Sequence, residues 1–261
     1  MLHNAGGEET LPISNYTQPA MVRVVWLIAR RQILEALLER SAIIMTAFFL
    51  VFQAVLVYVS LRPLLQDRLN PQTAGITATL MTFYLLFVGL MPSSPAIGIA
   101  AGVFAGDKER GCLTPILVLP VSNAAIFAGK VLGAVVPALL YSTINIIAYY
   151  LEILYFGPDK LRLLPLATSL LILLLIPGVT IFGAVLATII SSRVSTFQTA
   201  QTYSSIISTV LWFVLLGLIF VATAQGLLAF IAAVLAIYII DALLISIAAA
   251  TWRREEVIAR L

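Results

Sequence analysis

Six stretches of mostly apolar residues, each at least 20 residues long, determine what this chain can fold into. An α-helix needs about 20 such residues to cross the hydrocarbon core of a bilayer, where every backbone hydrogen bond must be satisfied internally. The chain is 61% hydrophobic and 10% charged, whereas soluble domains are about 45–50% apolar and about 25% charged. The sequence therefore predicts an all-α integral membrane protein whose six transmembrane helices cover residues 41–60, 74–105, 124–151, 166–190, 199–221 and 227–250.

The basic residues predict how these spans are oriented. If the N-terminus is cytoplasmic, four basic residues face the outside: Arg62, Arg68, Lys160 and Arg162. The other eleven then face the cytoplasm: Arg23, Arg30, Arg31, Arg40, Lys108, Arg110, Lys130, Arg193, Arg253, Arg254 and Arg260. Cytoplasmic loops carry such an excess. We therefore expect both termini in the cytoplasm and a place in an inner or plasma membrane. The net charge of +3 then reflects a leaflet preference and does not indicate a nucleic-acid partner.

The first 40 residues precede the first span. Residues 1–20 are polar and lack the basic start and apolar core of a signal peptide, so we expect a disordered cytoplasmic tail. Residues 21–40 alternate charged and apolar residues around Trp26, Arg30 and Arg31. A basic amphipathic helix with a tryptophan is typical of the membrane interface. We predict a separate interfacial helix here; the alternative is the polar end of a long first span.

The second span is longer than a bilayer requires. A single helix over residues 74–105 would be about 48 Å long, and Pro92 and Pro95 lie near its middle. Proline kinks a membrane helix where neighbouring helices or water satisfy the freed carbonyl groups. The sequence predicts such a kink, either as a structural feature or as a bend that lines a pathway.

The loop over residues 106–122 has an unusual composition. Four charged residues, Asp107 to Arg110, precede a short apolar stretch that ends at Pro120. That stretch is too short to cross a bilayer and too apolar for a free loop. We predict a short amphipathic helix that packs against a protein partner.

Several classes of chemistry are excluded by what the chain lacks. One cysteine and one histidine, His3, leave no internal disulfide, no thiolate cluster and no histidine-based metal site or triad. We therefore expect no enzymatic activity and no cofactor or metal in this chain. Asp241 is the carboxylate placed deepest in a span, where charge is costly. It either hydrogen-bonds to a neighbouring span or is protonated there, or it serves an ion-coupled secondary carrier, which is the alternative function.

The start of the fifth span carries a polar face. Gln198, Gln201, Ser205 and Ser208 have the spacing i, i+3, i+7, i+10 and so share one side of a helix. This face predicts either hydrogen bonds between helices or a polar lining of a transport pathway.

Residues 106–134, GDKERGCLTPILVLPVSNAAIFAGKVLGA, resemble the signature region of ABC-2-type transporter permeases. Those chains have a charged cluster, a Gly-Thr-Leu, a short helix, a Pro-Val-Ser and a Gly-Lys that opens the third span. Cys112 stands where that family usually has threonine or serine, and Pro115 where it often has glutamate. The matching residues here are Glu109, Arg110, Gly111, Leu113, Pro120, Val121, Ser122, Gly129 and Lys130.

The resemblance implies one ABC-2 transmembrane domain over 21–261, of the type V exporter kind, with 21–40 as connecting helix. In that family the loop 106–122 forms a coupling helix that docks on a separate ATPase subunit, which binds ATP and Mg. This chain lacks a phosphate loop, because Ala124 and Val131 occupy the required glycine and hydroxyl positions around Gly129-Lys130. The resemblance assigns ATPase coupling to Glu109, Arg110, Gly111, Leu113, Ile116, Leu117 and Pro120.

The resemblance also implies a second permease subunit, identical or different, with the export pathway between the second and fifth spans of the two. Amphipathic or lipidic cargo would suit such a pathway, and the substrate itself is left open. The residues assigned to the pathway and the subunit interface are Phe87, Pro92, Ser94, Pro95, Gln198, Gln201, Ser205 and Ser208.

Overall fold

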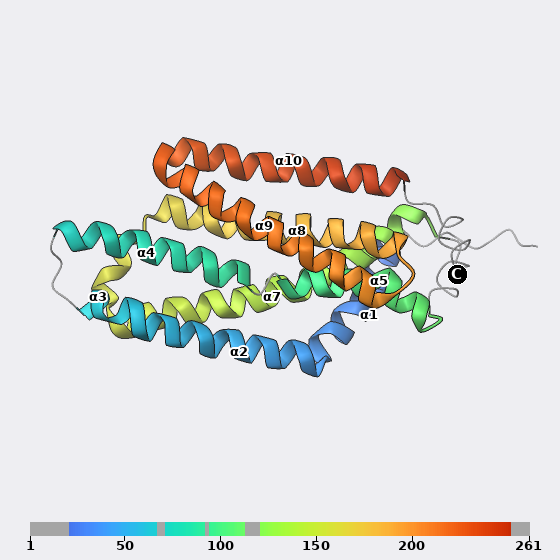
Figure 1. The fold of residues 1–261 in the computed structure, drawn as a ribbon, viewed down its shortest axis with the longest axis horizontal. Helices are drawn as coiled ribbons and strands as arrows, with labels where there is room; N and C mark the ends of the chain where they lie inside the picture. Colours follow the sequence, from blue (N-terminus) through green and yellow to red (C-terminus); the bar gives the residue numbers. More distant parts are fainter. Residues whose placement is uncertain (1–20, 67–70, 92–93, 113–120, 252–261) are drawn as a thin grey trace, which may run out of the picture.

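The computed structural model describes residues 21–66, 71–91, 94–112 and 121–251, and the regular structure in these ranges is entirely helical. The helices form an elongated bundle along one long axis (Figure 1). In chain order the elements are α1 (Met21–Leu38), α2 (Arg40–Leu56), the π-helical turn η1 (Val57–Leu61), α3 (Arg62–Gln66), α4 (Pro71–Leu90), α5 (Ser94–Glu109), α7 (Asn123–Phe156), the 3-10 turn η3 (Pro158–Leu163), α8 (Leu166–Arg193), α9 (Phe197–Gln225) and α10 (Leu227–Thr251).

Five helical stretches among the described residues are long and apolar enough to cross a membrane: Ala42–Gln66, Thr73–Leu90, Asn123–Phe156, Leu166–Arg193 and Leu227–Ala248. The chain is therefore an all-helical membrane protein, as its composition predicts. The predicted fifth span, 199–221, falls within α9, where the side chains of 215–216 and 218–225 lie outside the description. The total of six spans stays a prediction. Gly226, with φ +84°, makes the predicted turn between α9 and α10.

The predicted second span is wrong as a single helix. Residues 71–109 form two helices, α4 and α5, and α4 alone has 20 residues, enough to cross a hydrocarbon core. Pro95 is the second residue of α5, within the first turn, where a proline breaks no hydrogen bond of the helix. Pro92 lies outside the described residues. Pro95 therefore lies at the start of a new helix, where the sequence predicts a kink.

Residues 21–38 form a helix of their own, as predicted for the segment before the first span. Between α1 and α2, Glu39 has extended backbone angles, φ −69° and ψ 124°. Ala29, Ile33 and Ala36 bury one face of α1, whereas Trp26 is 57% exposed. The placement of α1 along the cytoplasmic face stays a prediction.

Two glycines of α7 allow α1 to pack closely. A Cβ atom added at Gly133 would lie 2.7 Å from Cβ of Gln32, and one at Gly129 would lie 2.9 Å from Cβ of Ile28. These glycines are four residues apart, so they lie on one face of α7, in the small-xxx-small pattern of closely packed membrane helices. Gly129 and Gly133 therefore lie in the contact between α7 and α1.

Helices α7 and α8 run through the centre of the bundle and contribute to both of its main buried clusters. One cluster, near the α3 end, includes Leu61, Leu85, Tyr149 and Ile172. The other, near α5, includes Phe104, Phe127 and Val185. This second cluster packs the end of α5 against the start of α7.

Candidate functional site

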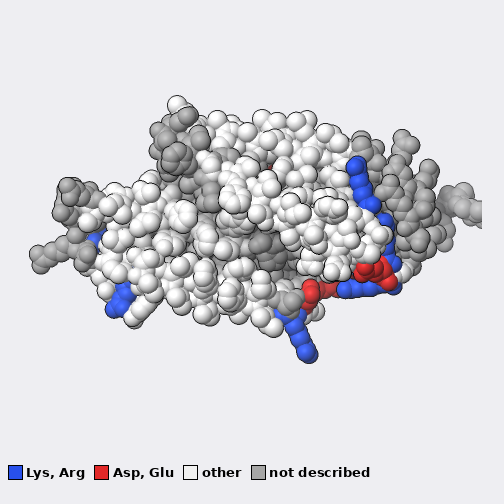
Figure 2. Space-filling model, viewed as in Figure 1, with Lys and Arg blue, Asp and Glu red and all other residues white. Residues whose placement is uncertain are grey.

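Most charged side chains lie at one end of the bundle, where α1, the end of α5 and the start of α7 come together (Figure 2). We call this the charged end. Eight of the described basic residues belong to it: Arg23, Arg30, Arg31, Arg40, Lys108, Arg110, Lys130 and Arg193. Arg62, Lys160 and Arg162 lie at the other end. This asymmetry agrees with the sense of the predicted orientation, which itself stays a prediction.

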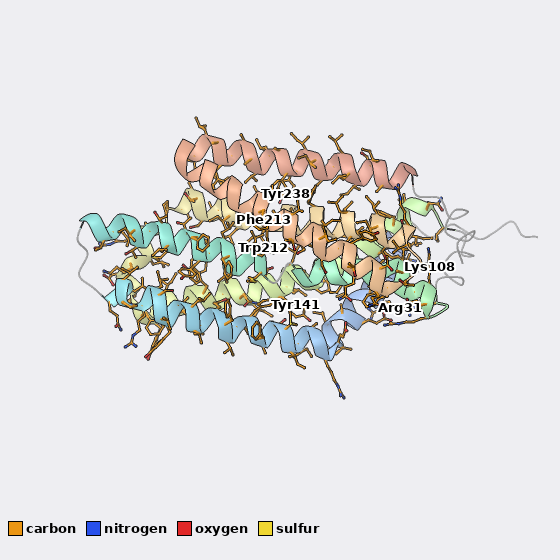
Figure 3. All side chains as sticks on the ribbon, in the orientation of Figure 1. Arg31, Lys108, Tyr141, Trp212, Phe213 and Tyr238 are labelled. Carbon is orange, nitrogen blue, oxygen red and sulfur yellow. The ribbon has the colours of Figure 1, made fainter. Side chains whose placement is uncertain are left out.

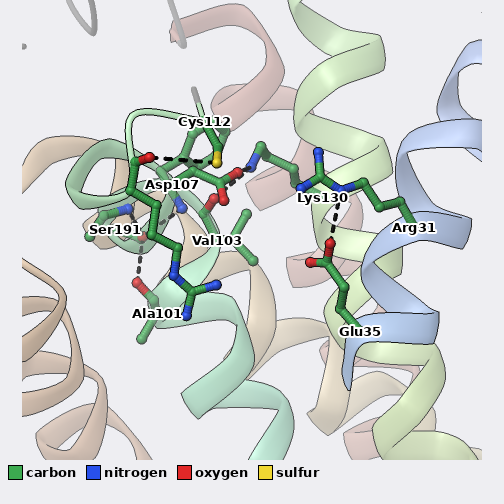
Figure 4. Close-up of polar contacts among 11 residues, drawn as sticks. Arg31, Glu35, Ala101, Val103, Asp107, Cys112, Lys130 and Ser191 are labelled. Atoms are coloured by element: carbon green, nitrogen blue, oxygen red, sulfur yellow. Dashed lines mark hydrogen bonds and ion pairs between the residues drawn. The ribbon is translucent and has the colours of Figure 1, made fainter. Parts of the chain in front are cut away.

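Lys130 joins α7 to α5 at the charged end (Figure 4). Its Nζ lies 2.6 Å from Oδ2 of Asp107 and also donates to the carbonyl oxygen of Val103. The same ammonium lies 4.7 Å from the centre of the Phe104 ring, a favourable cation–π position. Lys130 is 1% exposed. A charge so deeply buried needs a counter-ion and hydrogen bonds, and Lys130 has both, so it stabilises the helix junction.

Helix α5 is also bonded to the end of α8. Oγ of Ser191 donates to the carbonyl oxygen of Ala101 and accepts from the backbone N–H groups of Phe104 and Ala105, at 3.1 and 3.0 Å. Nζ of Lys108 donates to the carbonyl oxygens of Ser192 and Val194, at 3.4 and 3.3 Å. The last carbonyl groups of a helix lack partners within it, and Lys108 supplies one at the end of α8.

Glu109 connects α5 to α9. Its Oε1 accepts a hydrogen bond of 2.8 Å from the backbone N–H of Phe197, the first residue of α9. A carboxylate at this position complements the partial positive charge of a helix N-terminus. The Phe197 ring lies on α5, since a Cβ added at Gly102 would lie 2.9 Å from its Cε2. The lack of a side chain at Gly102 of α5 therefore allows the first residue of α9 to pack closely against it.

The predicted ATPase-coupling residues separate into two groups. Leu113, Ile116, Leu117 and Pro120 lie outside the described residues. Glu109, Arg110 and Gly111 are exposed at the charged end, and Gly111 has φ +67°, a left-handed conformation that glycine adopts without strain. One oxygen of Glu109 is already bonded within the chain, so Arg110 is the charged member of the cluster that projects outward.

The predicted pathway residues of α9 lie on its exposed side. Gln198, Gln201 and Ser205 are exposed, and Ser208 is half-buried. Oγ of Ser205 donates along the helix, to the carbonyl oxygen of Gln201 at 2.8 Å. No hydrogen bond joins this polar face to another helix within the described residues. Both interpretations of the face, hydrogen bonding between helices and a pathway lining, stay predictions.

The pathway residues of the second span are only partly described. The Phe87 ring lies 6.0 Å from that of Trp212 on α9, so α4 and α9 meet there. Figure 3 places Trp212 and Phe213 near the middle of the bundle. Pro92 lies outside the described residues, and nothing is described of the side chains of Ser94 and Pro95.

Two polar features lie within the spans. Asp241 is 3% exposed, and neither of its oxygens has a hydrogen-bond partner in the described chain. Nε2 of Gln53 donates to the carbonyl of Asn145 at 3.1 Å and approaches Oε1 of Glu152 at 3.4 Å. Sequence reasoning missed this second contact, because Gln53 and Glu152 are 99 residues apart and nothing in the pattern pairs them. No group of three His, Cys, Asp or Glu residues in the described ranges is placed to hold a metal ion.

No family model matches this sequence, and a search of curated proteins finds no significant match.

Proposed function

We propose that this chain is the transmembrane permease subunit of an ABC-2-type exporter. It would pair with a second permease subunit, identical or different, and take its energy from a separate ATPase that binds ATP and Mg. In this proposal the chain lies in the cell membrane with both termini on the cytoplasmic side. The charged end then faces the ATPase. It rests on the resemblance of residues 106–134 and on the exposed polar face of α9.

The polar face of α9 is the observation that carries the proposal. Gln198, Gln201 and Ser205 lie on the exposed side of a helix that begins at the charged end. Polar groups in contact with lipid chains are unfavourable, so such residues in membrane helices face other protein or water. Apolar residues such as Ile206 and Val210, both 56% exposed, cover the adjacent side of the same helix. The division suits a helix with one face toward a pathway and the other toward lipid.

A pair of cysteine variants tests this division. In a Cys112→Ser background, Ser205→Cys and Val210→Cys place one thiol on each exposed face of α9. We expect the membrane-impermeant thiosulfonate MTSES to label Ser205→Cys and not Val210→Cys in the assembled protein. Equal labelling, or labelling of Val210→Cys alone, would contradict a pathway on the polar face.

The ATPase partner needs a separate experiment. Purification of the chain from its native membrane should retain a polypeptide with a phosphate-binding loop in about equal amount. Leu117→Asp would place a charge in the apolar contact that the resemblance predicts, and an unpaired buried charge is strongly unfavourable. We expect this variant to insert normally and to lose the ATPase. Full retention of the ATPase would refute the coupling assignment.

Asp241 favours the alternative, an ion-coupled secondary carrier. Its carboxylate is buried in a span without a partner in the described chain, which is typical of groups that bind a proton or cation during transport. A carrier would move substrate on an ion gradient alone and would lose this activity in Asp241→Asn. An exporter would need ATP and would keep most activity in that variant.

A further inference from the structure

Three consecutive charged residues at the end of α5 each bind a different part of the bundle. Asp107 pairs with Lys130 of α7, Lys108 binds carbonyl groups at the end of α8, and Glu109 binds the first N–H of α9. We call Asp107, Lys108, Glu109 and Phe197 the α5 junction. The sequence pattern presents these charges as one cluster, but the structure directs them to three different helices.

The partners of Lys108 and Glu109 are the two ends of one turn. Ser192 and Val194 lie at the end of α8, and Phe197 begins α9. A cation at a helix C-terminus and an anion at a helix N-terminus each complement the helix dipole, an effect limited to the last or first turn. The end of α5 therefore binds the α8–α9 turn from both sides, with opposite charges.

Close packing adds to these polar contacts. The Phe197 ring lies against Gly102, where an added Cβ would come within 2.9 Å of it, and 3.9 Å from a Cβ at Gly106. On the α8 side, Ser191 forms three hydrogen bonds with the backbone of α5. A displacement of α5 relative to the α8–α9 turn would break these contacts together.

We propose that the last two turns of α5, the α8–α9 turn and the first turn of α9 move as one rigid unit, with Lys108 and Glu109 as positioning residues. Because α9 carries the polar face, a displacement of the end of α5 then moves that face directly. The proposal rests on the proposed function only for the source of the displacement, an ATPase acting beyond Arg110. The rigid unit would transmit a movement from the ATPase contact to α9, the proposed pathway helix.

A distance measurement tests the rigid unit without any transport assay. Spin labels on the native Cys112 and on Thr202→Cys of α9 report the separation of the two elements by pulsed electron resonance. We expect a narrow distance distribution for the otherwise unchanged protein and a clearly broader one for Lys108→Met/Glu109→Ala. The matched control Lys108→Arg/Glu109→Gln keeps a donor and an acceptor and should stay narrow. The same width for all three would overturn the proposal.

A transport measurement tests what the unit does. With the ATPase partner bound, Lys108→Met should clearly lower the amount of a fluorescent amphipathic dye exported per ATP hydrolysed. Lys108→Arg should restore it. Full coupling in Lys108→Met, together with a broadened distance distribution in that same variant, would show that the junction does not transmit the movement. If no ATPase associates with the unaltered protein, the proposed function fails, and the distance measurement still decides on the rigid unit.

Discussion

One ionisable side chain is buried where α5 meets α7, and another in the middle of α10. The two differ in the partners that surround them. Lys130 is 1% exposed and has a carboxylate, a carbonyl oxygen and an aromatic ring around its ammonium. Asp241 is 3% exposed, and its two oxygens have no hydrogen-bond partner in the described chain. The two side chains are therefore almost equally buried, but only Lys130 has hydrogen-bond partners among the described residues.

The contrast separates a structural group from a candidate functional one. A buried charge with all its partners in the same chain holds helices together, and its loss leaves those partners unsatisfied. A buried carboxylate without partners is neutral or binds something from outside the described chain. Burial alone would rank both residues as functional, whereas the neighbouring atoms distinguish them. Of the four predictions that follow, two test this difference directly and two provide the scale for it, from the largest expected effect to the smallest.

Removal of Asp107 should have the largest effect on stability. Asp107→Ala leaves the Lys130 ammonium buried without its counter-ion, a change that costs about 3–5 kcal/mol in a fully buried pair. We expect the lower end of this range, because the Asp107 side chain is 26% exposed and water can replace part of the lost interaction. Denaturant unfolding in detergent micelles measures it. The double variant Asp107→Ala/Lys130→Met should recover stability; a further loss would contradict the assignment of Lys130 as a charge-paired residue.

An alanine at Gly133 should destabilise the packing of α1. The new Cβ would lie 2.7 Å from Cβ of Gln32, and overpacking of this kind costs about 1–3 kcal/mol. Two measurements check this: hydrogen exchange of the α1 backbone amides should be faster in Gly133→Ala, and denaturant unfolding should show the lower stability. Gly75→Ala is the matched control, since a Cβ at Gly75 meets nothing within 4 Å. Equal effects of the two substitutions would mean that α1 does not depend on the close approach.

Neutralisation of Asp241 should change stability little. Asp241→Asn keeps the shape of the side chain and removes no hydrogen bond in the described chain, so we expect a change of less than about 1 kcal/mol. The same denaturant assay measures it beside Asp107→Ala. A loss as large as that of Asp107→Ala would show that Asp241 has a partner that stabilises the fold, and the contrast with Lys130 would disappear.

The exposed pair Arg31–Glu35 should contribute least. Nε of Arg31 lies 2.8 Å from Oε1 of Glu35, but the two side chains are 61% and 58% exposed. Pairs of this type, four residues apart on a helix, are worth about 0.3–0.5 kcal/mol. The hydrogen bond to Glu35 raises the pKa of Arg31, so the arginine stays charged throughout the assay. Glu35→Gln should lower stability slightly, and less in high salt. A loss above that of Gly133→Ala would contradict this ranking.

Much of the fold follows from local sequence patterns. The apolar stretches predict the membrane helices, the charged and apolar alternation predicts a separate α1, and Gly226 predicts the turn before α10. The sequence predicts a kink at Pro92 and Pro95, whereas α5 begins at Ser94, because Pro95 suits the first turn of a new helix as well as a kink. The helical structure that begins with α2 continues through η1 and α3 to Gln66, beyond residue 60, where the sequence predicts the end of the first span.

The candidate site follows from the sequence only in part. The charged cluster after the second span and the polar face of α9 were predicted as features, and α9 does expose that face. The partners of Asp107, Lys108 and Glu109 were not predicted, because they lie 23, 84 and 88 residues away along the chain. No periodicity relates residues at such separations.

The sequence by itself determined the class of protein, the presence of several apolar helices and the asymmetry of charge, because hydropathy and helix signals act over one or a few turns. Only the tertiary structure decided that α1 packs on Gly129 and Gly133 and that the charges of α5 bind the α8–α9 turn. It also decided that Lys130 has hydrogen-bond partners, whereas Asp241 has none among the described residues. These outcomes depend on which helices become neighbours. That choice is set by the packing of the whole bundle, which no single segment encodes.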